Sequence, residues 1–156
     1  MVVVFDSAGR ANSITNSAGK TIRITYNGNQ FDTVSNESGM LTFTYSGDYI
    51  TSITDSEGRT VHYTYADGNL TSFTNADCDT ILYSYNSSHD LTEVTNFEGE
   101  VILQNEYDGR HRVVEQCQPN LGTITYNYDD ANNTNSYTTE KGLTYTIVMD
   151  EQGRTL

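Results

Sequence analysis

The chain has 156 residues, of which only 35% are hydrophobic, and its 21 acidic against 8 basic side chains leave a formal net charge of −13. Such a surface repels nucleic-acid phosphates and anionic membranes, so we expect neither as a partner. No stretch approaches the roughly 18 apolar residues of a membrane-spanning helix, which excludes insertion into a membrane by that route. The low apolar content is unusual for a globular α/β enzyme and normal for a sheet with one wet face.

One register of apolar residues runs through the chain, and six of its eight members are Tyr. Successive members lie 19 to 22 residues apart. They are Phe5, Tyr26, Tyr45, Tyr65, Tyr85, Tyr107, Tyr128 and Met149, which we name the main column. A period near 20 residues does not fit a helical heptad and matches two short strands and two turns. The sequence therefore predicts an array of β-hairpins.

In chain order, the first predicted element is the end of a strand, Val2–Phe5. Each later unit is expected to contain a short strand, a Gly-centred turn, a longer strand and a polar turn such as Asn27-Gly28-Asn29. The short strands carry matching apolar residues, namely Ile14, Val34, Ile53, Phe73 and Val94. The Gly-centred turns contain Gly19, Gly39, Gly58, Gly99, Gly122 and Gly142.

The longer strands add two apolar columns upstream of the main one. Two residues before it lie Ile24, Phe43, Tyr63, Tyr83, Tyr126 and Ile147. Two residues earlier lie Ile22, Leu41, Val61, Ile81, Ile124 and Tyr145. Because polar residues separate the columns, as in Thr60–Tyr65, all three are expected on one face. We predict that this aromatic face is the structural core of the repeats.

The predicted fold is all-β: about seven hairpin repeats of 20 residues in a twisted, spiralling antiparallel sheet that spans residues 1–156. Both ends fall inside a unit, so we expect a piece of a longer array. Unpaired strand edges near Val2–Phe5 and Tyr145–Met149 would invite pairing with another copy, which predicts end-to-end self-association.

Three units depart from the common pattern. Asp77-Cys78-Asp79 stands where the fourth turn should have Gly, the fifth unit has extra residues within Val101–Tyr107, and the sixth contains the single proline, in Gln118–Gly122. We expect a bulge or a loop insertion at the last two places.

A short motif links the main column to the turns that follow it. Phe5-Asp6-Ser7-Ala8-Gly9-Arg10 and Met149-Asp150-Glu151-Gln152-Gly153-Arg154 share the spacing apolar-Asp-x-x-Gly-Arg, and Tyr107-Asp108-Gly109-Arg110 is a contracted form. The recurring motif resembles the tyrosine-aspartate (YD) repeats of Rhs-type proteins over essentially the whole chain. The units ending at Tyr26, Tyr45, Tyr65 and Tyr85 lack the Asp that should follow the Tyr.

The resemblance implies a shell in which β-hairpins spiral around a hollow interior, as in Rhs polymorphic toxins, insecticidal toxin complexes and teneurins. In the bacterial toxins the shell encloses a toxic domain. The implied role is therefore a non-catalytic wall segment, secreted or at the surface of a bacterial cell. Its implied partners are neighbouring repeats and an enclosed cargo domain.

The alternative is a cell-surface module that binds carbohydrate or choline on tyrosine shelves between hairpins. Such repeats rely on exposed Trp, and this chain has none. Burial of the tyrosine face would decide between wall and binder. Catalysis is not expected, because no Gly-x-Ser-x-Gly elbow or Cys/His signature occurs.

No metal or other cofactor is expected either. Cys78 and Cys117 lie two hairpins apart, too far for a disulfide, so both should be free thiols. The three histidines, His62, His89 and His111, do not have the spacing of a zinc site. Asp129–Asn133 is rich in oxygen ligands but lacks the Gly and Glu of an EF-hand, so we interpret it as a hairpin turn.

Overall fold

The computed structural model describes residues 1–150, 152, 154 and 155, and these residues form fifteen β-strands. The pairings between neighbouring strands within each unit are antiparallel, so the predicted all-β hairpin fold is confirmed. Among the described residues no helix is long and apolar enough to cross a membrane. The chain divides into two compact units, Met1–Thr80 and the residues from Ile81 onward.

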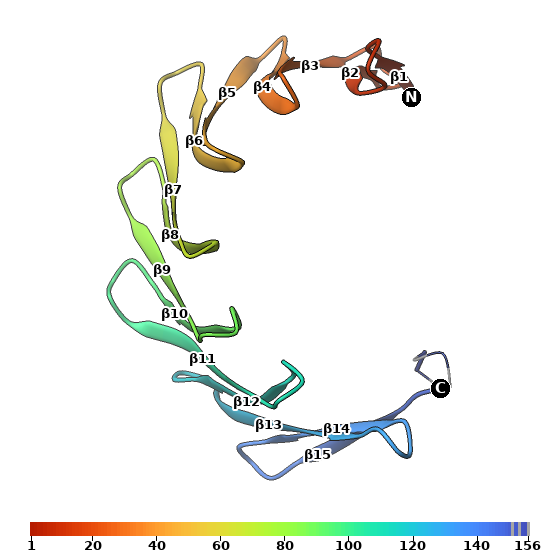
Figure 1. The fold of residues 1–156 in the computed structure, drawn as a ribbon, viewed down its shortest axis with the longest axis vertical. Helices are drawn as coiled ribbons and strands as arrows, with labels where there is room; N and C mark the ends of the chain where they lie inside the picture. Colours follow the sequence, from red (N-terminus) through yellow and green to blue (C-terminus); the bar gives the residue numbers. More distant parts are fainter. Residues whose placement is uncertain (151, 153, 156) are drawn as a thin grey trace. The chain divides into compact units, whose positions relative to one another are not determined.

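Within the first unit the strands follow one another in the sheet in chain order, and successive hairpins turn progressively (Figure 1). The strands are β1 (Val2–Phe5), β2 (Ala11–Thr15), β3 (Thr21–Asn27), β4 (Gln30–Asn36), β5 (Gly39–Ser46), β6 (Tyr49–Asp55), β7 (Thr60–Ala66) and β8 (Asn69–Thr74). Cross-strand pairs align the apolar columns: Phe43 pairs with Ile53, and Ile53 pairs in turn with Val61. Directly opposed residues share a face, so the columns form one apolar face, as the alternation predicts.

The second unit has the same order, and polar side chains interrupt its apolar face. Its strands are β9 (Thr80–Tyr85, beginning one residue before the boundary), β10 (Leu91–Thr95), β11 (Val101–Tyr107), β12 (Val113–Gln118), β13 (Gly122–Asp129), β14 (Thr134–Thr139) and β15 (Thr144–Val148). At the place where other hairpins oppose two apolar residues, Asn105 pairs with Gln116. The Gln116 Nε2 donates to Asn105 Oδ1 at 3.0 Å, so the polar pair is satisfied within the sheet.

Each unit is a single layer of strands, which gives its described residues no buried core. Among the described residues none is buried, and the main-column tyrosines are half-buried between their cross-strand neighbours. Phe5, at the edge strand β1, is 60% exposed. Packing within one sheet covers only the sides of the rings, and a second layer would be needed to cover the face.

Most turns in the described residues fall into two classes that differ by one residue; the loop between the paired residues Asp129 and Thr134 is longer, with four residues. In the longer class a three-residue loop is closed by two backbone bonds, as in Asp6 N to the Arg10 carbonyl (2.8 Å) and Gly9 N to the Asp6 carbonyl (3.0 Å). Seven further turns in the described residues have both bonds and begin at Asn16, Asp55, Asn75, Asn86, Asn96, Asp108 and Thr139. The shorter class has two-residue loops, such as Gly28-Asn29 between the paired residues Asn27 and Gln30.

Turn class explains the uneven spacing of the main column in the first unit. Phe5 and Tyr26 are 21 residues apart and are separated by two longer turns. Tyr26 and Tyr45 are 19 apart and are separated by two shorter turns. Tyr65 follows Tyr45 by 20 residues, with one turn of each class between them.

The structure differs among the three units that depart from the common sequence pattern. Cys78 occupies the positive-φ position of the longer turn (φ 69°), where Gly9 stands in the first turn, as the sequence predicts. In the fifth unit the register shifts between Val94 and Thr95, leaving Ile102 as an extra residue, so the predicted bulge is confirmed. In the sixth, Pro119 lies in the loop between β12 and β13, and no shift interrupts the pairing of these strands.

Candidate functional site: the Asp–Arg–Tyr clasp

The Asp6 side chain organises the first turn and holds the arginine that ends it. Its Oδ1 accepts hydrogen bonds from the backbone N–H groups of Ala8 (2.8 Å) and Arg10 (2.9 Å). Its Oδ2 accepts from Arg10 Nε at 3.0 Å and lies 2.9 Å from Nη2, giving a two-pronged ion pair. The Arg10 backbone N–H, with further help from the guanidinium, lowers the pKa of Asp6.

Arg10 then joins this turn to the next hairpin. Its guanidinium carbon lies 4.4 Å from the centre of the Tyr26 ring, and its Nη1 donates to the Gly28 carbonyl. The Tyr26 hydroxyl returns to the first hairpin and donates to the Ala11 carbonyl at 2.9 Å. We name the group Asp6, Arg10 and Tyr26 the first clasp.

A second clasp has the same geometry in the second unit and consists of Asp108, Arg112 and Tyr128. Arg112 Nε donates to Asp108 Oδ2 at 2.8 Å, and the guanidinium carbon lies 4.3 Å from the centre of the Tyr128 ring. The Tyr128 hydroxyl donates to the Val113 carbonyl at 2.8 Å. Asp130 adds a further contact, since its Oδ1 accepts from Arg112 Nη1 at 2.7 Å.

Burial and charge make the second clasp tighter than a surface ion pair. Arg112 is 29% exposed, between the Asp108 carboxylate and the Tyr128 ring. The pKa of Asp108 is lowered from 3.8 to about 2, first by the hydrogen bond from the Arg112 backbone N–H and then by the guanidinium. Burial raises the pKa of the Tyr128 hydroxyl.

The structure assigns other residues to this turn than the contracted Tyr107–Arg110 motif predicted from the sequence. Arg112, four residues after Asp108, takes the place that Arg10 has after Asp6, while Arg110 instead pairs with Asp130. His111, with φ 62°, stands at the position of Gly9. Sequence reasoning missed Arg112 and His111 because it looked for Gly directly before Arg. The signal that finds them is Asp followed by Arg at the fourth residue.

Two other turns carry the Asp–Arg pair without the aromatic partner. Arg154 Nε donates to Asp150 Oδ2 at 2.7 Å, and Gly153 of this turn lies outside the described residues. Arg59 Nε donates to Asp55 Oδ2 at 2.6 Å. Arg59 is 66% exposed, against 32% for Arg10, because no ring covers it.

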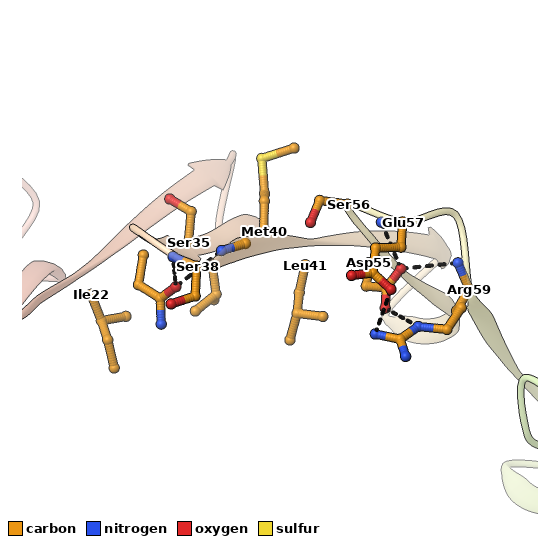
Figure 2. A pocket seen from close by; sticks show the side chains of 12 residues that line it. Ile22, Ser35, Ser38, Met40, Leu41, Asp55, Ser56, Glu57 and Arg59 are labelled. Carbon is orange, nitrogen blue, oxygen red and sulfur yellow. Dashed lines mark hydrogen bonds and ion pairs between the residues drawn. The ribbon is translucent and has the colours of Figure 1, made fainter.

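A shallow groove of about 350 Å³ lies beside the Asp55 turn (Figure 2). Ile22 and Leu41 contribute apolar side chains, whereas Met40 points to the opposite side of β5. At the polar end of the groove Arg59 binds Asp55 and also lies 3.3 Å from Glu57, so both carboxylates already have a partner. The residues that line the groove therefore include no unpaired charged side chain.

The longer turn, rather than the arginine, determines whether the tyrosine hydroxyl is bonded. Tyr107 follows the turn that begins at Asn86, and its hydroxyl donates to the Leu91 carbonyl at 2.7 Å without any arginine. Here His111 Nδ1 lies 3.0 Å from the Asp90 carboxylate and links the two neighbouring turns. Tyr45 and Tyr65 follow two-residue turns, and in the described part of the chain their hydroxyls make no such bond.

The described residues contain no group of three His, Cys, Asp or Glu side chains placed to hold a metal ion. In the Asp129–Asn133 turn the carboxylates already have partners: Asp129 Oδ2 accepts from Asn132 Nδ2 at 2.7 Å, and Asp130 binds Arg112. Cys78 and Cys117 are free thiols. The contacts found in the clasps are ion pairs, cation–π contacts and hydrogen bonds, and they connect one hairpin to the next.

Comparison with known proteins identifies the family to which this fold belongs. The family model described as teneurin YD-shell matches residues 1–105. The chain belongs to this family. The resemblance to YD repeats inferred from the Tyr and Asp-x-x-Gly-Arg pattern is thus confirmed, and the scaffold role of a YD shell comes with it.

Solved structures with the same fold come from toxin complexes. The TcdB2-TccC3-Cdc42 crystal structure is 15% identical with a TM-score of 0.69, covering 99% of this chain and 10% of that one. The Photorhabdus luminescens Tc holotoxin pore is also 15% identical, with a TM-score of 0.65, covering 94% and 9%. No curated protein sequence matches the chain. This YD-shell chain thus spans about a tenth of the structures that share its fold.

Proposed function

We propose that this YD-shell chain is a wall segment of a closed shell that encloses a toxin or another cargo domain, and that it performs no catalysis itself. The observation that carries the proposal is that the described strands form a single layer with no buried residue. A domain with its own binding or catalytic centre normally forms around a core. A single layer instead separates two sides, which is what a wall does.

The clasps support the same role. A wall of hairpins needs coupling between neighbours, because one hairpin buries too little surface to be stable alone. Arg10 and Arg112 supply that coupling from the turn of one hairpin to the ring of the next. The partners proposed for this chain are accordingly further repeats at β1 and β15 and the enclosed domain, in a protein that acts outside the cell.

The carbohydrate or choline module is the second proposal. No second layer covers the aromatic face, but several of its rings already contact a neighbouring side chain. Tyr137 and Tyr145 stack on each other, with centroids 4.9 Å apart and planes inclined by 17°. In the clasps, Arg10 and Arg112 cover the rings of Tyr26 and Tyr128. A sugar or a quaternary ammonium needs such a face for itself.

Two measurements test the wall against the binder. The native protein that contains this chain, purified with an antibody to it, should appear in electron micrographs as a hollow particle. Protease should spare its enclosed domain until the particle is opened. A solid or extended particle would reject the wall. In parallel, saturable thermal stabilisation of the 156-residue chain by one cell-wall glycan or by choline would favour the binder.

The free strand edges lead to a subsidiary proposal. All five residues of β15 are exposed, and Val2, Val4 and Phe5 of β1 are exposed as well. Neither strand carries a charged residue that would block pairing. We therefore propose that the isolated chain self-associates through these edges, which sedimentation at increasing concentration would detect.

A further inference from the structure

Six alternate hairpins, β1/β2, β3/β4, β5/β6, β7/β8, β9/β10 and β11/β12, each carry one extra residue at an equivalent place. In β3/β4, Thr25 pairs with Thr33 and Tyr26 pairs with Phe31, so Asp32 has no partner of its own. The same shift occurs beside each main-column residue from Phe5 to Tyr107, always on the second strand of the hairpin. The extra residues are Asn12, Asp32, Thr51, Thr71, Thr92 and Val114. The sequence predicts a bulge or a loop insertion at only two places, in the fifth and sixth units.

Three of the six extra residues make side-chain hydrogen bonds to the opposite strand. The Thr51 hydroxyl donates to the Thr44 carbonyl at 3.3 Å, and the Thr71 hydroxyl donates to the Thr64 carbonyl at 3.3 Å. In the β3/β4 hairpin the Thr25 hydroxyl donates to Asp32 Oδ2 at 3.2 Å. In all three cases the partner is the residue just before a main-column tyrosine. A polar side chain thus bonds back across the site where the ladder is interrupted.

A bulge bends its strand and increases the local twist. A single bulge gives a local kink, but bulges on the same strand of successive hairpins, at the same edge, add their bends in one direction. The β13/β14 hairpin supplies the contrast, because its pairs run from Ile124/Thr139 to Asp129/Thr134 without a shift. The bulges therefore form a series, and that series ends at a defined point.

We propose that the extra residue on the second strand of each hairpin sets the bend of the wall, so that the number of such residues determines how sharply a stretch of hairpins curves. The inference rests on the proposed function only for the biological role of the bend, since a closed shell needs a curved wall. The bend itself is a property of the chain. A failure to find enclosed cargo would leave it standing.

The test removes bulges and measures the bend inside the first unit. Deleting Thr51, or Thr51 together with Thr71, leaves every other strand pair in register and converts the hairpin to regular pairing. Nitroxide labels on the exposed native Cys78 and on an Ala18→Cys substitution, with Cys117→Ser, report one intra-unit distance by pulsed electron paramagnetic resonance. Six strand spacings separate these turns, which corresponds to about 29 Å in a flat sheet.

The expected result is a graded lengthening of the distance toward the flat value, with one step for each deleted residue. Thr51→Ala with Thr71→Ala is the matched control: it removes the hydroxyls, keeps the residue count and should leave the distance unchanged. An unchanged distance in the deletion variants would overturn the proposal. Loss of cooperative unfolding in the single deletion would also overturn it, because the extra residue would then be required for pairing rather than for the bend.

Discussion

The first hairpins of the first unit and those in its middle share one apolar face but differ at the sheet edge. At the first junction Arg10 binds Asp6 and covers the Tyr26 ring, whose hydroxyl bonds back to the preceding hairpin. At the next junction on that edge, the link between turns is a hydrogen bond from Gln30 Nε2 to the Gly47 carbonyl at 2.6 Å. The face holds hairpins together along the whole array, whereas the edge decides how strongly two particular neighbours are coupled.

The largest expected effect comes from removing a tyrosine ring at a clasped hairpin and at an unclasped one. Tyr65→Ala, at an unclasped hairpin, should cost about 2 kcal/mol, because a half-buried aromatic ring is lost. Tyr128→Ala should cost about 3 kcal/mol, because the cation–π contact and the hydroxyl bond are lost as well. Urea unfolding of both variants measures the difference. Equal losses would show that the clasp adds nothing to the ring.

Acid should weaken the second clasp, together with the other turns whose bonded carboxylates have a lowered pKa. The folded pKa of Asp108, about 2, lies below its ordinary 3.8, so the carboxylate contributes stability that is fully present above about pH 4 and is lost as the pH falls through 2. The melting temperature should therefore drop between pH 4 and pH 2. The Asp108→Asn variant should have a lower melting temperature than the wild type at neutral pH. Its melting temperature should also fall less between pH 4 and pH 2. A pH profile identical to that of the wild type would contradict the role given to Asp108.

A subtler change isolates the hydroxyl from the ring. Tyr128→Phe removes only the bond to the Val113 carbonyl and should cost about 1 kcal/mol. Tyr65→Phe is the matched control at a hairpin with a two-residue turn, and its cost should be near zero. Chemical denaturation resolves the two. The comparison fails if Tyr65→Phe costs as much as Tyr128→Phe.

The smallest expected effect is a gain. Cys78 has φ 69°, a conformation that suits glycine, and its longer turn otherwise resembles the one containing Gly9. Cys78→Gly should therefore raise stability by about 0.5–1 kcal/mol by relieving backbone strain. Ala76→Gly in the same turn serves as the control and should give no gain. Differential scanning calorimetry would show whether the thiol has a compensating contact.

The periodic tyrosines were sufficient to predict the hairpins, the shared face and the family, because strand alternation and turn chemistry repeat at every unit. Arg112 was not predicted. A positive φ can be adopted by His111 as well as by glycine, so a search for Gly before Arg chose Arg110 instead. The series of bulges on the second strands of alternate hairpins was also missed, for a different reason. Each short strand carries one strong apolar marker, such as Val34 or Ile53, and a single marker cannot reveal an extra residue beside it.

The two turn classes have an evolutionary consequence. Gaining or losing one residue in a loop exchanges one class for the other, and Tyr26, Tyr45 and Tyr65 keep the same face although their intervals differ. A one-residue slip of a strand would instead move its side chains to the opposite face. Single-codon insertions and deletions are thus tolerated at the hairpin tips. A gene for such a protein can drift in length there while the pairing of its strands is preserved.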